Sequence, residues 1–115
     1  MNWTELNSKQ QIEEIRTESN SQPVLIFKHS TRCAVSSTVL SRLERNWKAE
    51  EVAPIKMYYL DLLSHRNVSQ DVAESFDVEH ESPQVLILKD GNPVYVRSHL
   101  AIAYDEIKQF LPSKN

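Results

Sequence analysis

The pattern of apolar and polar residues divides this chain into strand-like runs and segments with the spacing of a helix. An unbroken apolar run from Val24 to Phe27, rich in branched and aromatic side chains, predicts a strand that is buried on both faces. Residues 55–62 predict a second strand. Two further strand-like runs flank Asp90 and Gly91, and they predict a hairpin because glycine tolerates the positive φ of tight hairpin turns.

Between these runs, apolar residues recur every three or four positions, which is the spacing of an amphipathic helix. The segments with this spacing are residues 7–19, 34–49, 64–78 and 101–112. Asn7 or Ser8 is expected to cap the first helix, and Pro112 to end the last one. The predicted order is helix, strand, helix, strand, helix, strand, strand, helix. This order indicates an α/β fold with a mixed central sheet flanked by helices on both faces.

Length, composition and charge narrow the classes of protein. The chain has 115 residues, 40% of them hydrophobic, so we expect one packed core and a single domain over residues 1–115. The formal net charge of −3 argues against nucleic acid or an anionic membrane as a partner. No apolar run approaches the ~20 residues that span a bilayer, and the amino terminus does not resemble a signal peptide. We therefore expect a cytoplasmic protein, and we expect it to be a monomer.

The chain contains one cysteine, Cys33, within the stretch KHSTRCAVSS. A lone cysteine cannot form an internal disulfide, so the fold cannot depend on oxidation. Cys33 falls where the first predicted strand gives way to a helix, and the free N–H groups and dipole of a first helical turn favour a thiolate. Lys28, His29 and Arg32 would add positive charge if their side chains turn toward it. The position favours a reactive thiol, and a buried packing residue is the alternative.

Two stretches of the sequence resemble known proteins. The element order, together with the stretch SPQVLILKDGNPVYV, resembles the thioredoxin fold, and this resemblance covers nearly the whole chain. Within that superfamily, HSTRCAVSS resembles the monothiol bacilliredoxins of the YtxJ type, whose site pattern is roughly Ser-Thr-x-Cys-Pro-x-Ser-Ser. Ser30, Thr31, Cys33 and Ser36 match this pattern, and Ala34 replaces its proline.

The resemblance implies roles for several residues. Cys33 would be the catalytic nucleophile, and Ser36, at the place of the resolving cysteine of dithiol thioredoxins, would donate a hydrogen bond to its thiolate. The Ser82-Pro83 bond would be cis and would face Cys33, with the Ser82 backbone offered to the bound thiol. A proline that simply begins a strand is the alternative. The residues expected to bind substrate are Thr31, Arg32, Ser82 and Pro83.

The resemblance also implies a thiol-disulfide oxidoreductase that removes a small thiol from mixed disulfides on client proteins. The small thiol would be bacillithiol, or glutathione in a host that uses it, and it would serve as a co-substrate with no tightly bound cofactor. Phe27 stands near the place of the buried acid of thioredoxins, which argues against general disulfide reductase activity. His29 and Cys33 lie close in sequence, but no second pair of such residues exists, so we expect no metal site.

A rival hypothesis comes from a different class of function. A thioredoxin-fold adaptor would keep the shape of the site without turnover, and it would use Cys33 as a sensor that records thiolation. Ala34, which replaces the proline of the family pattern, is the feature that favours this rival.

Overall fold

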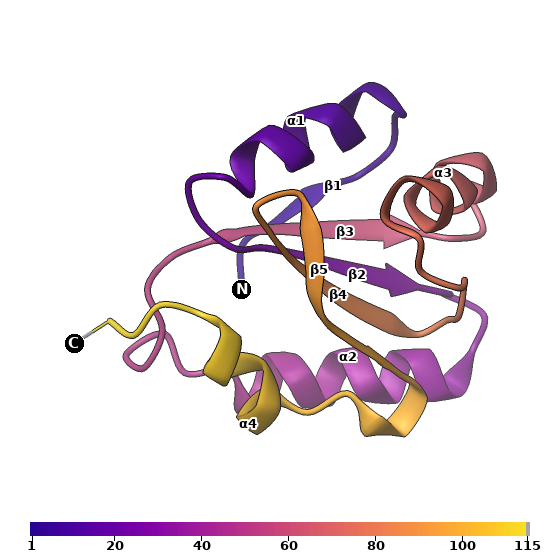
Figure 1. Ribbon diagram of the computed structural model, residues 1–115. Helices are drawn as coiled ribbons and strands as arrows, with labels where there is room; N and C mark the ends of the chain where they lie inside the picture. Colours follow the sequence, from indigo (N-terminus) through magenta and orange to yellow (C-terminus); the bar gives the residue numbers. More distant parts are fainter. Residues whose placement is uncertain (115) are drawn as a thin grey trace.

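The computed structural model describes residues 1–114, which form a five-stranded sheet covered by helices on both faces (Figure 1). The strands are β1 (Trp3–Glu5), β2 (Val24–His29), β3 (Lys56–Asp61), β4 (Gln84–Lys89) and β5 (Asn92–Ser98). The helices are α1 (Gln10–Glu18), α2 (Ala34–Asn46), α3 (Arg66–Phe76) and α4 (Tyr104–Ile107), with 3-10 turns at His99–Ala101 and Lys108–Phe110. The α/β architecture expected from the sequence pattern is confirmed.

The sheet has the order β1-β3-β2-β4-β5 and is mixed. β1, β3 and β2 run parallel, whereas β4 is antiparallel to both β2 and β5. β2 lies at the centre, with Val24 opposite Lys56 on one side and Leu88 on the other, and every residue of this strand is buried. An unbroken apolar run suits this place because a central strand of such a sheet is covered on both faces.

The core consists of two layers, one on each face of the sheet. Figure 1 shows α1 and α3 on one face and α2 and α4 on the other. Successive side chains of a strand point to opposite faces, so Ile26 packs under α1 and α3 while Phe27 packs under α2 and α4. The helical residues of the first layer are Ile12, Ile15, Val68, Val72 and Phe76. Those of the second layer are Val39, Leu43, Tyr104 and Ile107.

The turn between β4 and β5 is a two-residue hairpin loop, as predicted. Asp90 has a φ of 52° and Gly91 a φ of 78°, the combination that suits a twisted hairpin. The loop is fixed to the end of α1, because Ser19 Oγ accepts a hydrogen bond from Gly91 N at 2.8 Å. Arg16 Nη1 also donates to Gly91 O at 3.2 Å, so the hairpin and α1 support each other.

The amino-terminal segment differs from the sequence prediction in two ways. Residues 3–5 form a strand, β1, that pairs with β3, and three residues are too few for a hydrophobic period to appear. The expected caps of α1 are also wrong, because α1 begins at Gln10. Gln11 Oε1 instead accepts hydrogen bonds from Asn7 N at 2.8 Å and Ser8 N at 3.1 Å, so a residue inside the helix satisfies the backbone before it.

The carboxy-terminal segment is less regular than predicted. The continuous helix expected over residues 101–112 is a four-residue helix, α4, set between two 3-10 turns. Within residues 1–114, no helix is long and apolar enough to cross a membrane.

Candidate active site at Cys33

Cys33 is the N-cap residue of α2. The loop after β2 turns through a hydrogen bond from Cys33 N to Ser30 O at 3.1 Å, and α2 then begins as Ser37 N donates to Cys33 O at 3.1 Å. The backbone of Cys33 is extended, with φ −104° and ψ 117°, and the residue is partly exposed. Cys33 therefore lies at the amino-terminal end of a 13-residue helix, where solvent reaches it.

Ser36 is fully buried, and its hydroxyl joins the end of β2 to the first turn of α2. Ser36 Oγ lies 2.6 Å from His29 Nδ1 and accepts a hydrogen bond from Ser30 N at 3.1 Å. The sequence predicted a bond from this hydroxyl to Cys33. The structure gives it other partners, because Ser36 points inward to the sheet, and no bond to Cys33 occurs within residues 1–114.

His29 is buried, and its protonation state follows from this environment. Burial lowers the pKa of His29, and the carboxylates of Asp61 and Glu44 only oppose this effect. A neutral imidazole can accept at Nδ1 when its proton sits on Nε2. Since Ser36 Oγ already accepts from Ser30 N, its own proton is free to bond His29 Nδ1. The hydrogen bond between the two side chains then forms without a charge.

Lys28 points away from Cys33, on the opposite face of the sheet. Its ammonium is fully buried and donates to Ser69 O at 3.3 Å, with His80 Nδ1 also 3.3 Å away. Desolvation lowers the pKa of Lys28 to about 8. The positive charge expected near the thiol therefore does not come from Lys28 or from the buried His29. Because successive side chains of a strand point to opposite faces, Lys28 lies under α3. Burial disfavours the charged form of His29.

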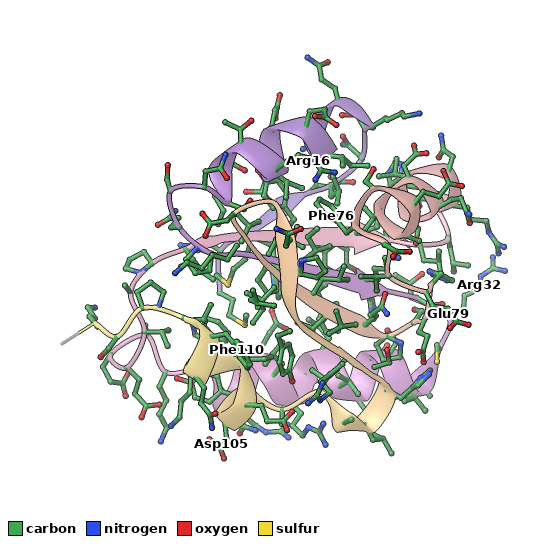
Figure 2. The ribbon with its side chains drawn as sticks, in the orientation of Figure 1. Arg16, Arg32, Phe76, Glu79, Asp105 and Phe110 are labelled. Carbon is green, nitrogen blue, oxygen red and sulfur yellow. The ribbon has the colours of Figure 1, made fainter. Side chains whose placement is uncertain are left out.

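Arg32, the third expected cation, is exposed, and Figure 2 shows it extending outward at the edge of the molecule. Thr31 and Arg32 line an open groove of about 410 Å³ beside the loop that carries Cys33. The other residues that line it are Asp61, Leu63, Ser64 and Arg66. Thr31 and Arg32 were predicted from the sequence to bind substrate, whereas Arg66 was not, because no motif around it in the sequence marks it as a site residue.

Ser82 and Pro83 lie at the same end of the sheet as Cys33. The peptide bond between them is cis, as the resemblance predicted. β2 and β4 are antiparallel with Lys28 opposite Gln84, so the residues just before Gln84 flank the residues just after Lys28. Pro83 is buried, and its carbonyl accepts a hydrogen bond from His99 N at 2.9 Å. Ser82 Oγ is buried with no hydrogen-bond partner in residues 1–114.

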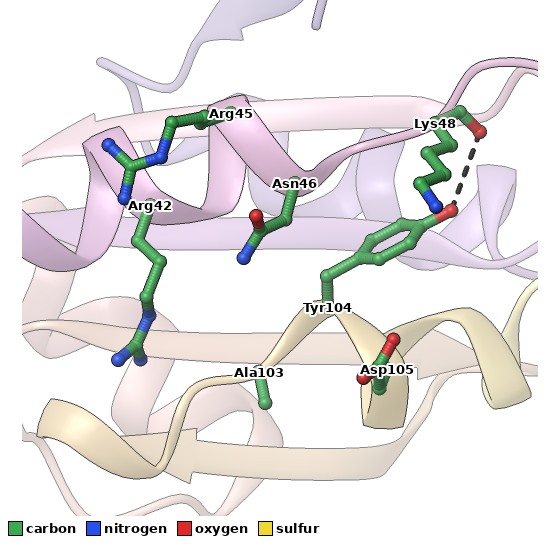
Figure 3. Close-up of a pocket in the computed structure, with 7 residues that line it drawn as sticks. All are labelled: Arg42, Arg45, Asn46, Lys48, Ala103, Tyr104 and Asp105. Carbon is green, nitrogen blue, oxygen red and sulfur yellow. Dashed lines mark hydrogen bonds between the residues drawn. The ribbon is translucent and has the colours of Figure 1, made fainter.

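Another cavity, of about 340 Å³, lies near the other end of α2 (Figure 3). Arg42, Arg45 and Tyr104 contribute to its lining, and the Tyr104 hydroxyl donates to Lys48 O at 3.4 Å. Arg45 is about 18 Å along the helix from Cys33, at 1.5 Å per residue. This cavity contains no thiol, and within residues 1–114 no group of three His, Cys, Asp or Glu side chains is arranged to hold a metal ion. The residues around Cys33 therefore form the candidate active site.

Comparisons with known proteins agree with this geometry. The family model for the monothiol bacilliredoxin BrxC matches residues 4–107. A solved structure of a thioredoxin-fold protein assigned as an oxidoreductase is 29% identical, with a TM-score of 0.73, covering 91% of this chain and 89% of that one. Thioredoxins resemble the chain in fold alone. That of Malassezia sympodialis is 14% identical with a TM-score of 0.68, covering 94% of this chain and 86% of its own. That of Trypanosoma brucei brucei is 11% identical with a TM-score of 0.70 and the same coverages of 94% and 86%.

Proposed function

Because the chain belongs to the monothiol bacilliredoxin BrxC family, we propose that it removes bacillithiol, or a similar small thiol, from mixed disulfides on client proteins. The family and the thioredoxin fold support a thiol oxidoreductase. The observation that carries the proposal is the position of Cys33, the only cysteine of the chain and the partly exposed N-cap residue of α2. In this proposal the protein acts as a single-domain monomer in the cytoplasm, where thiols stay reduced.

In the first step, the Cys33 thiolate attacks the sulfur of the small thiol within the mixed disulfide. A bond forms between Cys33 Sγ and that sulfur, the bond to the client cysteine breaks, and the client leaves as a thiolate. One disulfide replaces another, so this step consumes no oxidant or reductant. Cys33 now carries the small thiol.

The second step needs a thiol from outside the protein. Ser36 stands three residues after Cys33, and a hydroxyl cannot form a disulfide. The thiolate of a second small-thiol molecule attacks the small-thiol sulfur on Cys33, and Cys33 leaves as a thiolate. The two small thiols are joined as a disulfide, which a separate reductase returns to the reduced state with its own electron donor.

His29 and Ser36 act as positioning residues in this scheme. Their hydrogen bond, and the bond from Ser30 N to Ser36 Oγ, tie the loop that carries Cys33 to the first turn of α2. Phe27 packs beneath the same helix with no exposed surface, so an apolar ring lies near the place where thioredoxins carry a buried acid. A protein with one thiol has no second thiol to deprotonate, and such an acid has no task there.

The test uses a client protein that carries bacillithiol on a single cysteine. Mixed in stoichiometric amount, this protein should take the adduct from the client, and mass spectrometry should find the added mass on Cys33. With excess bacillithiol and its reductase, a substoichiometric amount should clear the whole client pool, because the external thiol regenerates Cys33.

Two controls separate the proposal from its rival. Cys33→Ser should abolish both transfer and turnover while leaving the protein folded. If the client adduct moves to Cys33 but is not released by excess bacillithiol, the sensor hypothesis replaces catalysis. If no adduct moves at all, although the protein is folded and the adduct is accessible, a non-catalytic adaptor becomes the better description.

A further inference from the structure

The groove beside Cys33 is formed by two loops that the sheet brings together. β2 and β3 are parallel neighbours, and their last residues, His29 and Asp61, are paired. The pairing continues into the loops, because Leu62 N donates to His29 O at 2.9 Å. Figure 1 shows that both loops lie at the end of the sheet where α2 begins. Ligands of open α/β sheets commonly bind at this edge, beyond the carboxyl ends of parallel strands.

Two arginine side chains of the groove are not used by the fold. Arg32 and Arg66 are exposed, and within residues 1–114 neither guanidinium has a hydrogen bond or an ion pair. Two other arginines of the chain, by contrast, bond the backbone of distant segments. Arg16 donates to Ser75 O and Gly91 O, and Arg42 donates to Leu100 O and Ile102 O.

The carboxylate in the groove, that of Asp61, forms no ion pair with either arginine within residues 1–114. Asp61 Oδ1 accepts a hydrogen bond from Leu63 N at 3.1 Å, and Oδ2 accepts one from Ser64 Oγ at 3.1 Å. Asp61 is therefore held by its own loop. With two arginines and one aspartate, the lining keeps a net positive charge.

A buried cation lies behind the same region. A smaller cavity of about 170 Å³ shares Arg66 with the groove and is also lined by Ser69 and His80. The Lys28 ammonium contacts the backbone carbonyl of Ser69 and the imidazole of His80, and neither group is an anion. A buried ammonium without an anionic partner is costly, and this one lies against two residues of the smaller cavity, which shares Arg66 with the groove.

We propose that the groove binds the carboxylate groups of the small thiol, through Arg32 and Arg66, while Cys33 attacks the sulfur of that thiol. A guanidinium suits this task because its planar N–H groups match a carboxylate in bidentate geometry. Bacillithiol and glutathione each carry two carboxylates, so their shared chemistry fits the site. The proposal rests on the proposed function and names the part of the substrate that the protein recognises.

The test compares charged and uncharged adducts on one client. The client cysteine carries bacillithiol, glutathione or 2-mercaptoethanol, and the rate of transfer to Cys33 is measured in single turnover against client concentration. The variants are Arg66→Gln, Arg32→Gln and the double variant. Arg45→Gln is the matched control, because it removes the same charge from an exposed, unpaired arginine near the other end of α2.

For the double variant, the half-saturating concentration of a carboxylate-bearing adduct should rise roughly tenfold, with a smaller rise for each single variant. The 2-mercaptoethanol adduct should react at an unchanged rate, and Arg45→Gln should behave as wild type. A rise for only one of the two carboxylate-bearing thiols supports the site and identifies its natural ligand. Equal losses for charged and uncharged adducts, an equal loss in Arg45→Gln, or no loss in the double variant would each overturn the proposal.

A binding measurement keeps this inference separate from the proposed function. S-methyl bacillithiol cannot react, so calorimetric titration into the Cys33→Ser protein measures the groove alone. Saturable binding that is weakened by Arg66→Gln and by added salt supports the site even if wild-type protein fails to transfer any adduct. Absence of binding, together with normal transfer of every adduct, overturns the site and leaves the oxidoreductase standing.

Discussion

Ser36 Oγ lies 2.6 Å from His29 Nδ1, and both side chains are buried between β2 and α2. The same oxygen accepts a hydrogen bond from Ser30 N, so one hydroxyl connects the end of the strand, the loop and the first turn of the helix. Cys33 lies between these anchored residues. Ser36, at the place of a resolving cysteine, therefore helps to fix the loop that carries Cys33.

The first prediction concerns the stability that this hydroxyl contributes. Ser36→Ala leaves Ser30 N and His29 Nδ1 without their partner in a buried place, so the free energy of unfolding should fall by about 1 to 3 kcal/mol. Urea denaturation measures this change. Ser37→Ala is the matched control, since Ser37 is the next residue of the helix but is exposed, and its effect should stay within about 0.5 kcal/mol. Equal effects of the two substitutions would contradict the assignment.

The second prediction concerns pH, and it follows from the lowered pKa of His29. The unfolded side chain takes up a proton near pH 6.5, whereas the folded one does so only at lower pH. Between these values the unfolded state binds more protons, so the free energy of unfolding decreases as the pH falls through this window.

His29→Asn isolates this contribution, because the asparagine side chain can still accept a hydrogen bond from Ser36 but does not titrate. The stability of the variant should therefore fall less than that of wild type as the pH is lowered below about 6.5. Urea denaturation at several pH values gives both slopes. Parallel slopes would show that His29 is as easily protonated in the folded protein as in the unfolded chain.

The third prediction concerns the buried ammonium of Lys28, whose pKa is lowered to about 8. As the pH rises above this value, the folded protein releases a proton that the unfolded chain keeps up to about pH 10.4, so wild-type stability should increase across this range.

Lys28→Met replaces the ammonium with an apolar group of similar length. At neutral pH the variant should be more stable than wild type by about 1 kcal/mol or more, because a buried charge without an anionic partner is removed. The rise in stability above pH 8 should also disappear. A variant that is less stable at neutral pH, with the alkaline rise retained, would mean that the ammonium is better satisfied than its two contacts indicate.

The sequence predicted most of the fold because the core elements carry clear periods. The apolar run of β2 predicts a buried strand, and Asp90-Gly91 predicts a tight hairpin turn. The tertiary structure contains both. β1 was missed since three residues at an edge, held mainly by pairing with β3, leave no period. The expected caps of α1 failed because Gln11, inside the helix, reaches back to the same backbone groups.

The candidate site was predictable only where one residue marks it. Cys33 could be placed at the start of a helix from the strand before it and the helical period after it. The partners of Ser36 could not be predicted. Its contact with His29, seven residues earlier, depends on how the loop folds back over the end of β2. Arg66 could not be found either, because it joins Arg32 only through the pairing of β2 with β3.

The last prediction restores the missing thiol. Positions 33 and 36 are the N-cap and the third residue of α2, close enough for a disulfide after rotation of the side chains. Mild oxidation of Ser36→Cys should therefore consume both thiols and form one internal bond. When Cys33 of this variant carries a small thiol, the new thiolate should attack Cys33 Sγ, and the small thiol should leave without help from a second molecule.

Ser41→Cys is the control. Position 41 is exposed and lies about 12 Å from Cys33 along the helix axis, which is too far for a disulfide. Thiol titration and mass spectrometry follow both events. If oxidised Ser36→Cys retains two titratable thiols, as Ser41→Cys should, position 36 is held too firmly toward His29 to meet Cys33, and the site is built for an external thiol alone.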